Sequence, residues 1–171
     1  MLKLLIILPC LFLKLQPLNA KVEAPNYNFD FGIFNEFMPE KKISDIEAKY
    51  SKGEVMSEQR GTQTIKFNVS HPRYKFPVFV QARNGVVLDF FARLPSYFLH
   101  DVFHQSIINR YGKQNTYKKV GEEAFYVWEK SPLKHIYSGA CTITCFPIFY
   151  TVHPLDTKGM TPLIQQMQKK N

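Results

Sequence analysis

Two histidines, His100 and His104, have the type and spacing in this chain that come nearest to a metal site. Residues four apart on a helix lie on one side of it, so their imidazoles can bind one ion. The pair supplies half of the ligands that a zinc site needs, and no glutamate follows His100 in an H-E-x-x-H pattern. The alternative is that both rings pack and form hydrogen bonds at the flank of the helix. We therefore predict no cofactor and keep zinc at His100 and His104 as an alternative.

Two cysteines, Cys141 and Cys145, are the next candidates. In a straight strand, residues four apart are separated by about 13 Å, whereas a disulfide needs Cα atoms within roughly 7 Å. Either the residues between them turn and the cysteines form a disulfide, or the two thiols stay separate in a strand. An oxidising compartment favours the disulfide.

The sequence lacks the motifs of the common catalytic sites. It has no G-x-S-x-G nucleophile elbow and no glycine-rich phosphate loop. Asp89 stands in an apolar run, so it either faces outward or is buried with a partner. We therefore lean towards a non-enzymatic protein, and propose Tyr97, Arg110 and Tyr111 as a candidate binding surface.

A predicted helix from Leu94 to Gly112 positions the histidines and this surface. Pro95 suits a first turn, and Gly112 suits a left-handed cap. Alternating or apolar runs on both sides of the helix predict strands over 62–69, 74–82, 86–93, 124–128, 135–145 and 147–152. Asn84-Gly85 predicts a hairpin turn between the second and third strands. Residues 54–61 and 113–121 are polar and are predicted as a loop and a connector.

These elements predict an α+β fold, a single antiparallel sheet of about five or six strands with one main helix packed on a face. The order is strand–strand–strand–helix–strand–strand, preceded by a short N-terminal helix. Ser44 and Glu47 have the spacing of a capping box for that short helix, near residues 45–52.

The first 20 residues have the pattern of a secretory signal peptide, with Lys3 before an apolar run and Ala20 at its end. The alternative is an uncleaved N-terminal anchor. The predicted divisions are a signal peptide (1–20), an aromatic arm with a short helix (21–61), an α+β core domain (62–153) and a polar tail (154–171). The sequence therefore predicts export to a periplasmic or extracellular compartment.

The chain of 171 residues is basic, with 22 Lys and Arg against 14 Asp and Glu and a formal net charge of +8. For an exported protein, this charge favours an envelope or extracellular protein, or an anionic surface, as the partner rather than nucleic acid. We predict a small exported binding or accessory domain. The alternatives are a metal-binding protein or metal-dependent hydrolase using the histidine pair, and a peripheral membrane-surface protein. The oligomeric state stays open.

Overall fold

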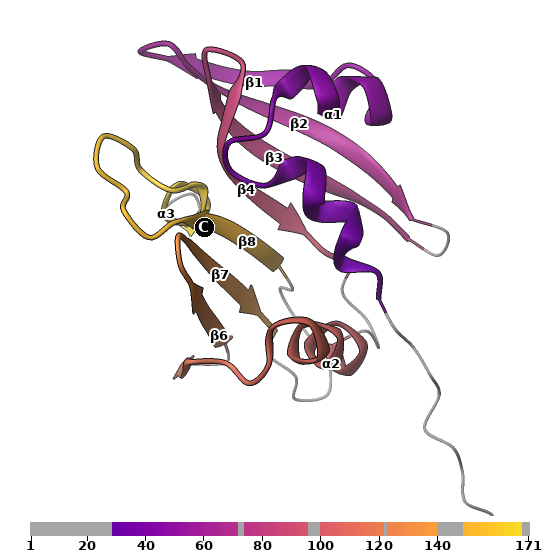
Figure 1. The fold of residues 1–171 in the computed structure, drawn as a ribbon, viewed down its shortest axis with the longest axis vertical. Coiled ribbons are helices and arrows are strands. Elements are labelled where there is room, and N and C mark those ends of the chain that lie inside the picture. The colour runs from indigo at the N-terminus through magenta and orange to yellow at the C-terminus, as the bar shows by residue number, and fades with distance from the viewer. Residues whose placement is uncertain (1–28, 72–73, 96–99, 122, 140–148, 169–171) are drawn as a thin grey trace, which may run out of the picture.

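In the part of the chain that the structure describes, one antiparallel sheet has eight strands in the order β1-β2-β3-β4-β8-β7-β6-β5 (Figure 1). The structure is a computed structural model, and it describes residues 29–71, 74–95, 100–121, 123–139 and 149–168. The strands are β1 (Glu54–Gln59), β2 (Thr62–His71), β3 (Tyr74–Arg83), β4 (Val86–Arg93), β5 (Thr116–Val120), β6 (Glu123–Lys130), β7 (Leu133–Ser138) and β8 (Phe149–Pro154). Two groups of four neighbouring strands, β1–β4 and β5–β8, are joined where β4 pairs with β8.

The predicted fold class is wrong in its strand number and in its main helix. The sheet has eight strands instead of five or six, and small helices cover it in the described residues. They are the 3-10 helix η1 (Phe31–Phe37), α1 (Ile43–Tyr50), α2 (His100–Tyr111) and α3 (Leu163–Gln168). The predicted helix over 94–112 corresponds to α2, which has 12 residues. It covers one part of the sheet, and η1 and α1 lie over another (Figure 1).

The two missed strands, β1 and β5, are the edges of the sheet. They lie in the segments predicted as a loop and a connector, and every residue of both is exposed. A strand buried on neither face has no reason to alternate apolar and polar residues, and that alternation is the signal by which a strand is recognised in a sequence. β1 and β5 are therefore strands because their backbones pair with β2 and β6, and their side chains show no alternation of buried and exposed positions.

The main hydrophobic core lies between one face of the sheet and the elements η1, α1 and α2. Four phenylalanines of the N-terminal segment enter it, each at most 4% exposed: Phe29, Phe31, Phe34 and Phe37. The Phe34 ring stacks on Phe90 of β4, with 5.5 Å between centroids, and lies 5.1 Å from the Tyr150 ring of β8. The N-terminal aromatic segment therefore shares one core with the sheet.

The opposite face of the sheet carries a smaller core under α3. Leu163 and Ile164 of this helix pack with Phe91, Ile136 and Phe149 of the sheet. The short helix leaves room beside it, over β1–β3, for a polar cleft.

Candidate functional site

A cleft of about 710 Å³ lies beside η1, and we call it the η1 cleft. It is lined by residues of η1, the end of α1 and β2: Asp30, Gly32, Ile33, Asn35, Glu36, Lys49, Tyr50, Ser51, Asn68 and Ser70. Its volume falls within the range of small-ligand sites, about 300–1,000 Å³. Eight of these ten residues carry polar side chains, so the cleft suits a polar ligand.

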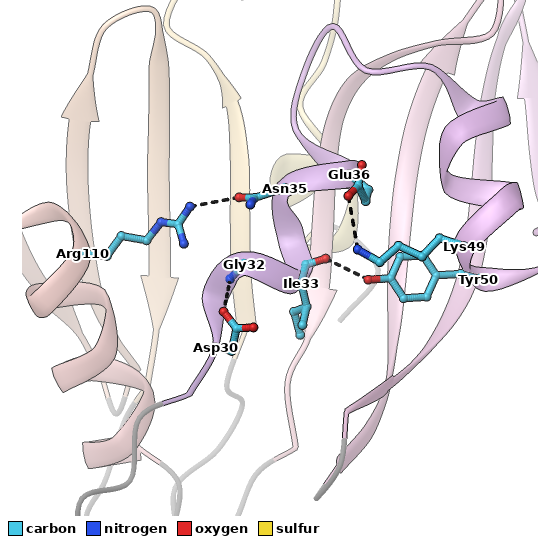
Figure 2. Close-up of polar contacts among 8 residues, drawn as sticks. All are labelled: Asp30, Gly32, Ile33, Asn35, Glu36, Lys49, Tyr50 and Arg110. Atoms are coloured by element: carbon cyan, nitrogen blue, oxygen red, sulfur yellow. Dashed lines mark hydrogen bonds and ion pairs between the residues drawn. The ribbon is translucent and has the colours of Figure 1, made fainter.

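Hydrogen bonds between α1 and η1 hold the walls of the η1 cleft in place (Figure 2). The ammonium group of Lys49 contacts Oε1 of Glu36 at 3.2 Å, and this bond raises the pKa of Lys49. The hydroxyl of Tyr50 donates to the carbonyl oxygen of Ile33 at 3.1 Å. Burial raises the pKa of Tyr50, so its hydroxyl keeps its proton at neutral pH.

One wall of the η1 cleft is an open strand edge. β1 pairs with β2 as far as Glu54 opposite Lys66, and among the described residues no strand lies on that side of 67–71. Asn68 and Ser70 are alternate residues of this stretch, and both line the cleft. The backbone N–H and C=O groups of such an edge are a template on which another chain can pair.

The predicted binding residue Arg110 lies close to this region. Its guanidinium donates to Oδ1 of Asn35 at 2.9 Å (Figure 2), and it lines a smaller cleft of about 380 Å³ with Phe29 and Asp30. Tyr111 is half-buried, with its ring 4.4 Å from that of His135. Tyr97 lies outside the described residues. Of the three residues predicted to form a binding surface, Arg110 is therefore the one that lines a cleft in the structure.

His100 and His104 lie together over β6 and β7. Their ring centroids are 5.4 Å apart and the rings are stacked. Nδ1 of His100 forms a hydrogen bond of 2.9 Å with the Tyr137 hydroxyl, and the His104 ring lies 4.1 Å from that of Tyr126. Burial lowers the pKa of both imidazoles, which leaves them largely neutral at pH 7.

A zinc site at this histidine pair stays a prediction. In the described part of the chain, no third histidine, cysteine or carboxylate joins His100 and His104 in a group that could hold a metal ion. Nδ1 of His100 is engaged by Tyr137, whereas Nε2 of His104 is buried without a hydrogen-bond partner there. Further ligands would have to come from outside the described residues.

The predicted disulfide of Cys141 and Cys145 lies outside the described residues and stays a prediction, as do the signal peptide and the compartment. Among the residues that are described, no helix has the length and apolar character needed to span a membrane. Association with a membrane surface also stays a prediction.

Sequence reasoning missed Gln81 of β3, and it left the environment of Asp89 of β4 open. Gln81 and Asp89 lie opposite each other on the paired strands β3 and β4. They are 7% and 0% exposed, respectively. Oε1 of Gln81 and Oδ1 of Asp89 have no hydrogen-bond partner among the described residues. The available signal was a lone polar residue in an apolar strand, since buried polar groups usually serve a structural or functional purpose.

Comparison with known proteins identifies no family for this chain. No known family and no curated protein matches it. It is similar to the crystal structure of a DUF4309 family protein, YjgB, from Bacillus subtilis subsp. subtilis str. 168. The TM-score is 0.45 at 11% identity, over 68% of this chain and 80% of that one. This level of likeness assigns neither a fold family nor a function.

Proposed function

We propose that the protein is an exported, non-enzymatic accessory domain that binds an extended segment of another protein in the η1 cleft. The observation that carries this proposal is the open edge of β2 beyond Lys66, which forms a wall of the cleft. An extended peptide can add to a strand edge by main-chain hydrogen bonds, and neighbouring side chains then select its sequence. Tyr50, Lys49 and Glu36 would supply that selection.

The remaining walls support such a ligand. The η1 cleft carries acidic, basic, hydroxyl and amide side chains together, and this mixture matches the groups that a polypeptide offers. The cleft is built on η1, whose phenylalanines are fixed in the core, so the site is held by a rigid frame. A preorganised groove reduces the entropy cost of binding.

The test starts from a library of extended decapeptides, from which the mature chain selects the peptides that it binds. NMR then maps which residues of the chain contact the selected peptides. We expect perturbed and protected backbone amides within residues 67–71, together with changes at Tyr50. In β-strand addition, the backbone N–H groups of alternate ligand residues donate hydrogen bonds to the strand edge. N-methylation at one set of alternate positions should therefore abolish binding, while methylation at the other set is tolerated.

Two matched variants separate this site from the rest of the surface. Tyr50→Ala removes a wall of the η1 cleft and should weaken binding, whereas Tyr117→Ala removes an exposed tyrosine from the distant edge strand β5 and should leave it unchanged. Peptides that tolerate both methylation patterns, or that shift residues outside the η1 cleft, would contradict the proposal.

Export is tested separately by intact mass of the protein recovered from its own compartment, with and without reductant. We expect a mature chain that begins near Lys21, and a mass two hydrogens lower before reduction if Cys141 and Cys145 are bonded. A full-length chain retaining Met1 would contradict cleavage and favour the anchor alternative.

A further inference from the structure

The two edge strands of the sheet, β1 and β5, carry opposite charges. β1 contains two glutamates and no cationic residue, whereas β5 contains two adjacent lysines and no carboxylate. Every residue of both strands is exposed, and among the described residues no strand lies beyond either edge. An unpaired edge offers a row of backbone N–H and C=O groups on which another strand can pair.

The charged groups of both edges are available to a partner. Glu54 and Glu58 each contact a side chain of β2 through Oε2, at 3.2 Å and 2.9 Å. Oε1 of each glutamate forms no hydrogen bond or ion pair with a described residue. Lys118 and Lys119 form no ion pair within the described part of the chain.

Apolar side chains are exposed on the same two edges. Large hydrophobic side chains are exposed at six described positions, and four of these positions lie on β1 and β5. They are Val55, Met56, Tyr117 and Val120, each 50–55% exposed. Aromatic and β-branched side chains on neighbouring strands stabilise the pairing of those strands. Both edges therefore carry apolar groups that a further strand would cover.

The directions of the two edge strands allow the sheet to continue from one copy of the chain to the next. Each of the seven pairings that connect β1 to β5 is antiparallel, so the two edges run in opposite directions. A second copy that continues the twist of the sheet therefore brings its β1 antiparallel to β5. The same face of the sheet then continues across the junction, and backbone hydrogen bonds can form as in the rest of the sheet.

Each face of such a junction has one lysine and one glutamate. Lys118 lies opposite Phe125, which packs with the smaller core, so it is on the α3 face, as is Glu54. Lys119 and Glu58 lie on the face that η1, α1 and α2 cover. Opposite charges thus meet on both faces when β5 of one copy pairs with β1 of another.

We propose that the protein self-associates head to tail, with β5 of one copy paired with β1 of the next. Pairing of β1 with β1, or of β5 with β5, would bring like charges together, which is unfavourable across strands. Because β1 and β5 are different surfaces, the contact is heterologous and leaves one edge at each end for a further copy. It uses residues outside the η1 cleft and does not depend on the function proposed there.

The contact is short, so association should depend on protein concentration. β5 has five residues, and a bulge at Met56 interrupts the regular part of β1; small interfaces of this kind are weak. The first experiment is sedimentation of the mature chain from micromolar to millimolar concentration. We expect the average mass to rise beyond that of a dimer. A monomer at every concentration would overturn the proposal, as would a dimer that does not grow further.

Charge reversal tests which edges pair. Lys118→Glu/Lys119→Glu makes both edges acidic, and Glu54→Lys/Glu58→Lys makes both edges basic. We expect each variant alone to associate about tenfold or more weakly than wild type. An equimolar mixture should regain association, since the acidic β5 of one variant meets the basic β1 of the other. A mixture as dissociated as its components would overturn the proposal.

General attraction between the two variants does not account for a regain. The formal net charge of +8 changes to +4 in one variant and to +12 in the other, so the variants repel each other overall. The matched control is Lys41→Glu/Lys42→Glu, which reverses two exposed lysines before α1 and changes the net charge by the same amount. It should associate as wild type does, and a loss equal to that of the β5 variant would overturn the proposal.

Hydrogen exchange of the wild-type chain locates the contact, even if a variant fails to fold. We expect backbone amides of β1 and β5 to exchange more slowly in the associated protein than in the monomer. Slower exchange within residues 67–71, with no change in either edge strand, would place the contact in the η1 cleft and overturn the pairing of β5 with β1.

Discussion

The Oδ2 atom of Asp89 in β4 accepts a hydrogen bond of 2.6 Å from the backbone N–H of Leu163 at the start of α3. A carboxyl group in the middle of the sheet therefore holds the C-terminal helix in place. Burial raises the pKa of Asp89 to about 7, although the Leu163 bond acts in the opposite direction. The protonation state of this group should influence stability near neutral pH.

Asp89→Asn should change how stability depends on pH. Asp89 binds its proton more tightly in the folded protein than in the unfolded chain, so its contribution to stability is greatest below pH 4. That contribution is lost as pH rises towards 7, by about 4 kcal/mol for a shift of roughly three units. Asparagine keeps an acceptor for Leu163 and does not titrate. Denaturant unfolding from pH 4 to 8 should show the variant gaining stability over wild type as pH rises.

The control for this prediction is Asp45→Asn, which exchanges an exposed carboxylate at the first turn of α1. We expect its stability to follow that of wild type across the same pH range. If the Asp89→Asn and wild-type curves ran parallel from pH 4 to 8, Asp89 would not titrate with the raised pKa.

His135 should have the opposite effect on stability. Desolvation by burial, with further repulsion from Arg110 and Lys130, lowers the pKa of His135 to about 4. The unfolded chain therefore binds the proton more tightly, and stability falls as pH drops from about 6.5 to 4, by about 3 kcal/mol. Burial likewise lowers the pKa of His153. Asp89 and these histidines oppose each other in the same pH range, which flattens the wild-type profile.

His135→Asn tests this opposition. It removes the titrating ring that forms a 2.7 Å hydrogen bond with the Tyr150 hydroxyl, so overall stability should decrease. The loss should be smaller at pH 4.5 than at pH 7, as measured by denaturant unfolding at each pH. A loss of the same size at both values would show that His135 is not the titrating group.

Gly139→Ala should disturb the hydrogen bond between His100 and Tyr137. A Cβ at residue 139 would lie 2.7 Å from the Tyr137 hydroxyl oxygen and would overlap Nδ1 of His100. Forcing these groups apart should cost about 1–3 kcal/mol in the free energy of unfolding. In a double-mutant cycle, Tyr137→Phe should reduce the cost of Gly139→Ala because it removes one of the overlapping atoms. Additive costs would indicate that the overlap is relieved elsewhere.

Phe34→Ala should test whether the N-terminal segment is essential for the core. The Phe34 side chain is fully buried and stacks on Phe90, so truncation should cost about 3–5 kcal/mol. Lys41→Ala, at an exposed position near the same segment, should change stability by less than about 0.5 kcal/mol. A small effect of Phe34→Ala in chemical unfolding would mean that the sheet is stable without η1.

Local turn chemistry predicted part of the fold well. Asn84 and Gly85 both have positive φ, 52° and 75°, as the two-residue hairpin turn requires, and β4 has the predicted bounds Val86–Arg93. The capping box of Ser44 and Glu47 was wrong, because α1 begins at Ile43 without a side-chain cap. The Ile43 N–H donates to the Gly85 carbonyl oxygen at 2.9 Å, so a contact with a distant turn determines where this helix begins.

The clefts could not be predicted from the sequence because their walls come from distant segments. Asn35 meets Arg110 across 75 residues, and no local spacing relates them. By contrast, the two residues of the histidine pair were brought together as predicted, because one helix carries both. The spacing of two residues in the sequence shows whether they share a face when both lie on one helix or strand. For residues on different strands, their proximity depends on the strand order, which the sequence spacing does not show.

That strand order also has a kinetic consequence. β4 finds its next neighbour in β8, the last strand among the described residues, and not in β5, which follows it. The ring contact of Phe34 with Tyr150 likewise needs β8 to be present. The core can therefore close only after β8 has been synthesised, and closure across such a long separation in sequence is slow.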